Sequence, residues 1–97
     1  MVENKEESGA SFPDFLLWLA TMAAVNFGDL PDPATGKRVE PNVTAAGQLI
    51  EIIGMLQEKT AGNLSPDEAK LLDDLLYDLR MRFVEAQKGE KRIILEP

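Results

Sequence analysis

The sequence predicts an all-α fold of three helices, and three observations lead to this prediction. Apolar residues recur at intervals of three and four over two long segments, a spacing typical of amphipathic helices. A third segment, Phe15 to Phe27, has only two polar side chains, Thr21 and Asn26. Start and stop signals bracket all three segments. Because 97 residues fit at most one domain, we expect the helices to pack into a single unit.

The first helix is predicted to begin at Ser11. The Ser11 hydroxyl suits an N-cap, Asp14 follows three positions later as in a capping box, and Pro13 suits the first turn. Gly28 supplies the stop, because glycine readily adopts the left-handed conformation that ends many helices. The next segment, "GDLPDPATGKRVEP", holds three prolines and two glycines, so it is predicted to be a loop.

The second helix is predicted from the N-cap Asn42 to about Ala61, with Gly62 as its stop. One face of this helix carries Ala46, Leu49, Ile53, Leu56 and Thr60. Two glycines, Gly47 and Gly54, lie away from that face. Each interior glycine costs about 1 kcal/mol relative to alanine, so the pair indicates a close approach of another backbone.

The segment "TAGNLSPDEA" carries the signals of a tight turn between two helices. Ser65 is the expected N-cap of the next helix, Pro66 its first residue, and Glu68 completes a capping box. Leu64 precedes the cap and can pack on the first turn. The full turn signature comprises Lys59, Thr60, Gly62, Asn63, Leu64, Ser65, Pro66 and Glu68. The second and third helices are therefore predicted to form an antiparallel hairpin with the first helix packed on it.

The third helix is predicted from Pro66 to about Lys88, with Gly89 as its stop. Its seam toward the second helix consists of Leu72, Leu75, Leu76, Leu79, Phe83 and Ala86. Acids near its start and bases near its end match the helix dipole, and Asp78 is expected to pair with Arg82. Residues 1–10 are expected to form a disordered acidic tail, residues 11–88 the helical domain, and residues 89–97 a flexible tail.

The predicted helices carry more apolar surface than they can cover. A second stripe on the third helix, Tyr77, Met81 and Val84, lies opposite its seam. The first helix is apolar all round, yet its thirteen residues are too few to span a bilayer, which takes about 20. We therefore expect a homo-oligomer, most simply a dimer. The candidate interface residues are Phe15, Trp18, Leu19, Ala20, Met22, Ala23, Ala24, Gly47, Gly54, Tyr77, Met81 and Val84.

The composition argues against several kinds of chemistry. The chain has neither cysteine nor histidine, so it lacks the commonest metal ligands and the commonest acid–base group. A net charge of −7 with scattered Lys and Arg argues against nucleic-acid binding. We expect no enzymatic activity, no metal and no cofactor. The N-terminus does not resemble a signal peptide, so the cytoplasm is the expected location.

The segment "MLQEKTAGNLSPDEAKLLDDLLYDLRMRFVE", Met55 to Glu85, resembles an uncharacterised bacterial family of short helical proteins, the domain of unknown function 1844. The likeness extends back through "FLLWLATMAAVNFGDLPDP", so it covers roughly residues 12–85. The most specific part is the ordered set Lys59, Thr60, Gly62, Asn63 and Leu64. Glu51 stands where the family usually has aspartate. The resemblance implies a small helical protein and no particular activity.

Two functional hypotheses remain open from the sequence. The first is a non-enzymatic, homo-oligomeric protein-interaction module. The alternative is a protein that binds a membrane surface, an acyl chain or another apolar ligand through its first helix. That helix lacks the Lys- and Arg-rich face of an interfacial helix, which disfavours lipid. The biological process and the identity of any other protein partner do not follow from the sequence.

Overall fold

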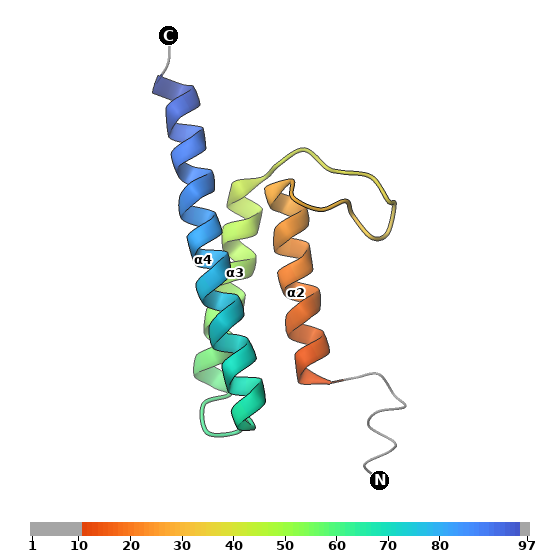
Figure 1. Cartoon of the computed structure of the whole chain (residues 1–97), viewed down its shortest axis with the longest axis vertical. Helices are drawn as coiled ribbons and strands as arrows, with labels where there is room; N and C mark the ends of the chain where they lie inside the picture. The colour runs from red at the N-terminus through yellow and green to blue at the C-terminus, as the bar shows by residue number, and fades with distance from the viewer. Residues whose placement is uncertain (1–10, 96–97) are drawn as a thin grey trace.

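Three α-helices make up the fold. The structure is a computed structural model that describes the backbone of residues 11–95 and the side chains of residues 11–89. The helices are α2 (Phe12–Phe27), α3 (Val43–Lys59) and α4 (Pro66–Leu95), and the described residues include no strand. Each helix packs against the other two (Figure 1). The predicted all-α fold is confirmed, whereas the predicted tail at residues 1–10 lies outside the described residues.

Helix α2 begins and ends as its sequence predicts. The Ser11 hydroxyl oxygen accepts a hydrogen bond from the Asp14 backbone N–H at 3.1 Å, which confirms the N-cap. Gly28 is the C-cap, with a left-handed φ of +86°, and its N–H donates to carbonyls of the last turn. Local chemistry therefore sets both ends of this helix.

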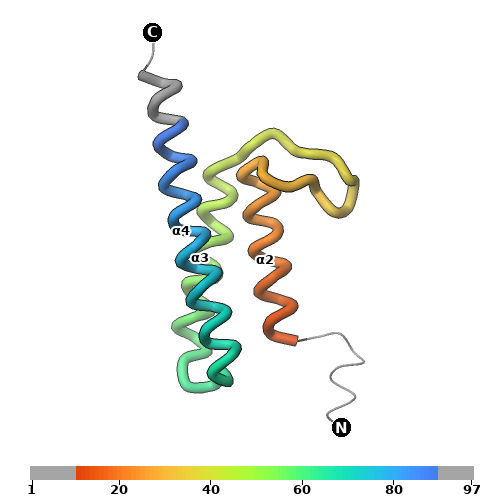
Figure 2. Tube along the Cα trace, viewed as in Figure 1, coloured from red at the N-terminus to blue at the C-terminus, as the bar shows by residue number. Residues whose placement is uncertain are grey.

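The connection between α2 and α3 is a wide loop that returns to the end of α2 (Figure 2). Its last residue, Asn42, donates from its backbone N–H to the Asn26 carbonyl at 2.7 Å. Arg38 donates from its guanidinium to the Gly28 carbonyl at 2.8 Å. The Asn42 side chain then caps α3 by accepting from the Ala45 N–H at 3.0 Å, as predicted.

The turn between α3 and α4 contains the predicted capping box. The Ser65 N–H donates to the Glu68 carboxylate at 2.9 Å, and the Glu68 N–H donates to the Ser65 hydroxyl at 3.2 Å. Helix α3 ends at Lys59 with Thr60 as its C-cap, slightly before the predicted end at Ala61. Gly62 is therefore a turn residue rather than the cap, although its φ of +85° is left-handed as expected.

The predicted end of α4 is wrong. The helix continues through Gly89 to Leu95, well past the expected stop at Lys88. Gly89 has no left-handed φ, unlike Gly28 and Gly62, so it does not terminate the helix. Figure 1 shows the C-terminal part of α4 rising beyond the ends of α2 and α3.

One apolar core joins the three helices. Its buried side chains are Leu16, Leu19, Ala23, Phe27, Ala46, Ile50, Ile53, Leu72, Leu76 and Leu79. The predicted seam of α4 is confirmed, because Leu75, Phe83 and Ala86 pack against this core as partly buried residues. The most completely buried large side chains are Leu16, Ile53, Leu72 and Leu76, which come from all three helices.

Candidate interaction surfaces

Polar chemistry lies on the surface of this molecule rather than inside it. Among the described residues, none of the buried side chains is polar or charged. The described part of the chain also contains no group of three or more His, Cys, Asp or Glu residues that could hold a metal ion. Within the same part, every helix is too short or too polar to cross a membrane. The features that remain for a site are exposed apolar surfaces, shallow grooves and ion pairs.

Helix α2 presents an exposed apolar surface on the side away from the core. Trp18 is 58% exposed, Phe15 is 44% exposed, and Met22 is partly exposed. Their spacing of three and four residues places them on one side of the helix, and we call them the α2 surface. Asp14 is the only charged residue in α2. Ala20 and Ala24 are partly buried, and Ala20 packs against the core.

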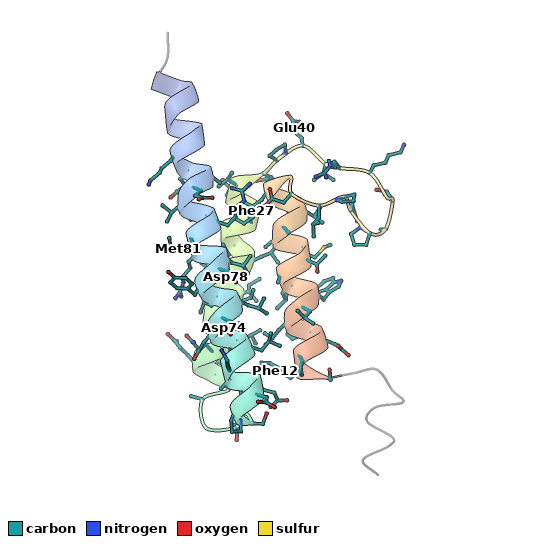
Figure 3. All side chains as sticks on the ribbon, in the orientation of Figure 1. Phe12, Phe27, Glu40, Asp74, Asp78 and Met81 are labelled. Atoms are coloured by element: carbon teal, nitrogen blue, oxygen red, sulfur yellow. The ribbon has the colours of Figure 1, made fainter. Side chains whose placement is uncertain are left out.

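Helix α4 presents a second apolar surface, formed by the predicted stripe of Tyr77, Met81 and Val84. These side chains are 66%, 51% and 43% exposed, respectively. Figure 3 shows Met81 on the side of α4 that faces away from α2. We call these three residues the α4 surface. Unlike the α2 surface, it lies among charged residues, including Asp74 and Asp78.

Two predicted interface residues of α2 lie inside the fold instead. Leu19 is 4% exposed and Ala23 is fully buried, and both belong to the core. The sequence alone could not separate them from their neighbours, because α2 is apolar on nearly every side. A charge at Ala23 would therefore disrupt the fold of the single chain, whatever its effect on assembly.

Gly47 and Gly54 are also not free interface positions. A methyl group on Gly47 would lie 2.8 Å from Cε1 of Phe83, and one on Gly54 would lie 3.2 Å from a guanidinium nitrogen of Arg80. Both glycines thus face α4 of the same chain, so their predicted position away from the helix contact is wrong. The neighbours of these glycines are the side chains of Phe83 and Arg80 on α4, not the backbone that the sequence predicts. A shallow groove of about 220 Å³ here is lined by Gly47, Ile50, Glu51, Arg80 and Phe83.

A second groove lies at the turn between α3 and α4. It measures about 210 Å³, and its lining includes three members of the predicted turn signature, Thr60, Gly62 and Leu64. Leu64 packs against the core. Lys59 and Asn63 are exposed, and the Asn63 backbone N–H donates to the Thr60 carbonyl at 2.9 Å. The capping box and the backbone bonds account for the shape of this turn.

An ion pair that the sequence did not predict ties the α2–α3 loop to α4. Arg82 donates two hydrogen bonds to the carboxylate of Asp29, each at 2.7 Å. The guanidinium carbon also lies 4.9 Å from the centre of the Phe27 ring, within the range of a cation–π contact. The predicted partner of Arg82 was Asp78, four residues earlier on α4. That prediction is wrong, because Arg82 forms its bidentate pair with Asp29 instead.

This ion pair also affects the ionisation of both partners. The hydrogen bonds from Arg82 lower the pKa of the Asp29 carboxyl, and the same bonds raise the pKa of Arg82. The pKa of Lys70 is also raised, by its hydrogen bond to Asp74. All three are exposed or partly exposed side chains in ion pairs, so these shifts follow from surface pairing.

Comparison with known proteins places this fold in a family. A family model described as a domain of unknown function (DUF1844) matches residues 9–85. The chain belongs to the DUF1844 family. The DUF1844 match covers α2, α3 and every buried core residue of α4, and it ends at residue 85 within α4. No curated protein and no solved structure matches the chain. The resemblance that the sequence suggested is therefore confirmed, and it assigns no activity.

Proposed function

We propose that this DUF1844 protein is a non-enzymatic interaction module that associates with further copies of itself. The observation that carries the proposal is the amount of exposed apolar surface. Among the described residues, ten large apolar side chains are more than a third exposed: Phe15, Leu17, Trp18, Leu30, Val39, Ile52, Met55, Tyr77, Met81 and Val84. Grouped apolar side chains at a protein surface mark interaction sites.

The proposal is supported by the small size of the fold. A domain of this length buries only about 60–65% of the surface that its unfolded chain exposes, so its own core gives modest stability. Burying apolar side chains against a second copy adds about 25 cal/mol for each Å² removed from water. Two-fold pairs are the commonest protein assemblies, and we therefore expect a dimer.

Analytical ultracentrifugation of the full chain tests this proposal. We expect a dimer or larger species at micromolar concentration, with dissociation on dilution. A compact monomer over the whole accessible concentration range contradicts it. In that case the exposed apolar side chains remain in water, and their spacing has no role in assembly.

Binding to a membrane surface or an apolar ligand is the competing explanation for the α2 surface. Helix α2 carries no lysine or arginine, which a helix needs to engage anionic headgroups. The grooves of about 210 and 220 Å³ are smaller than the roughly 300–1,000 Å³ typical of ligand pockets. Flotation with neutral and with anionic vesicles separates the two explanations. Recovery of the protein with vesicles at ordinary salt would favour the membrane role.

A further inference from the structure

The charges of α4 indicate how a second copy would pack against it. Residues 66–80 contain five acids and two bases, a net charge of −3. Residues 81–95 contain four bases and two acids, a net charge of +2. Two α4 helices side by side in parallel would place like charges together, whereas an antiparallel pair would place the acidic half of each beside the basic half of the other. The antiparallel arrangement also aligns the helix dipoles favourably.

The spacing of the exposed residues supports a two-fold axis at the middle of α4. Asp74, Met81 and Lys88 are separated by intervals of seven, so they lie along one side of the helix. Tyr77 and Val84 fall between them, and this alternation of threes and fours is the heptad pattern of paired helices. Met81 lies near the centre of α4. Asp74 and Lys88, which carry opposite charges, are each seven residues away from it.

The length of α4 supports the same arrangement. Ala86 is the last described side chain of α4 that packs against the core, and both Gln87 and Lys88 are exposed. The helix nevertheless continues to Leu95, beyond the ends of the other two helices (Figure 1). Helices in proteins gain most of their stability from packing rather than from intrinsic propensity. An antiparallel partner would lie alongside this extension.

We propose that two copies pair through antiparallel α4 helices about a two-fold axis near Met81, with Asp74 of each chain beside Lys88 of the other. This inference rests on the proposed self-association and names the surface that carries it. The two Met81 side chains then meet on the axis, and Tyr77 and Val84 pack on either side. Asp74 keeps its bond from Lys70, which it accepts through Oδ2. The α2 surface has no comparable pattern of charges to fix the orientation of a partner, because Asp14 is the only charged residue of its helix.

Cysteine cross-linking tests the two-fold axis directly, since the chain has no native cysteine. Met81→Cys places a single thiol at the proposed axis, where it meets its own copy. Trp18→Cys on the α2 surface and Ile52→Cys on α3 are matched controls, because both positions are exposed. We expect oxidation of the full chain to give a covalent dimer for Met81→Cys and little for the controls, with helix content unchanged.

Charge exchange tests the antiparallel register. Asp74→Lys and Lys88→Glu should each weaken dimerisation about tenfold, because two symmetry-related contacts change from attraction to repulsion. The double variant D74K/K88E restores opposite charges across the axis, so it should recover most of the lost affinity. A double variant no tighter than the single variants would overturn the antiparallel register.

The outcomes separate this inference from the proposed function. A dimer by ultracentrifugation that cross-links through Trp18→Cys and not through Met81→Cys overturns the α4 pairing and leaves self-association intact. A monomer at all concentrations overturns both. Cross-linking at Met81→Cys together with recovery in the double variant supports both the surface and its orientation.

Discussion

Gly47 and Gly54 form a matched pair of helical glycines that differ in what a methyl group would meet. At Gly54 the nearest atom is a terminal nitrogen of the long Arg80 side chain, which can shift by rotation about its bonds, so Gly54→Ala should raise the free energy of unfolding by up to about 1 kcal/mol through helix propensity. At Gly47 the methyl group would overlap the packed ring of Phe83, and Gly47→Ala should lower it by about 1–3 kcal/mol. Urea unfolding of both variants measures the difference. Equal stabilisation by the two substitutions would mean that α3 and α4 lie farther apart at Phe83.

The capping box at Ser65 gives a second test at the residue scale. Ser65→Ala removes the hydroxyl that accepts from the Glu68 N–H, and the loss should cost about 1 kcal/mol. Ser65→Asp keeps an acceptor at the cap, so it serves as the control and should retain most of the stability. Thermal unfolding followed by circular dichroism measures both. A harmless Ser65→Ala would show that water replaces the hydroxyl at this helix end.

Local hydrogen bonds were predictable from the sequence, and distant ones were not. The caps at Ser11, Asn42 and Ser65 each join residues three apart, so the spacing of residue types was sufficient. Asp29 and Arg82 are 53 residues apart, and only the packing of the helices brings them together. From the sequence, Asp78 is the expected partner of Arg82 because it is four residues away. In the structure, Arg82 pairs with Asp29 instead.

At the scale of elements, the pair of Asp29 and Arg82 should fasten the α2–α3 loop to α4. A double-mutant cycle with Asp29→Ala and Arg82→Ala should give a coupling of about 0.5–1 kcal/mol at neutral pH, a modest value because both side chains are partly exposed. The coupling should depend on pH in a defined direction. The pKa of Asp29 is lowered in the folded state, so its stabilisation is complete above the ordinary value near 4 and is lost as the pH falls through the lowered value.

Unfolding measured from neutral to strongly acidic pH checks this dependence. Arg82→Lys is the informative control, because lysine keeps the charge and loses the two-pronged bond and the planar contact with Phe27. A coupling that persists unchanged at strongly acidic pH would contradict the assignment of this coupling to the ionised carboxylate of Asp29.

A side-chain cap predicts an element boundary well, whereas a glycine alone predicts the end of a helix in some cases and not in others. Gly28 ends α2 because its backbone is left-handed, whereas Gly89 lies within α4 in a helical conformation. Residue type does not distinguish the two cases, since glycine tolerates both conformations. Gly47 shows a related limit: the sequence indicated a close approach, and only the packing identified α4 of the same chain as the neighbour.

At the scale of the whole molecule, α2 is apolar on nearly every side, but the core covers only part of it. On one side of α2, Leu16, Leu19 and Ala23 are buried in the core that α2 shares with α3 and α4. Phe15 and Trp18 remain exposed on the other side. Hydropathy alone cannot divide such a helix into core and surface, because its three polar residues, Asp14, Thr21 and Asn26, are too few to mark a boundary.

The melting temperature of the whole protein should therefore depend on its concentration. A partner that binds only the folded chain adds stability in proportion to the logarithm of its free concentration, so the melting temperature of a dimer rises on concentration and that of a monomer does not. Leu76→Ala is the control for the fold alone: it should cost about 2–5 kcal/mol and lower the melting temperature throughout, while the dependence on concentration persists. Differential scanning calorimetry over a wide concentration range measures both effects. A melting temperature that stays constant over that range would mean that the unfolding unit is the single chain, and that its exposed apolar side chains add nothing to its stability.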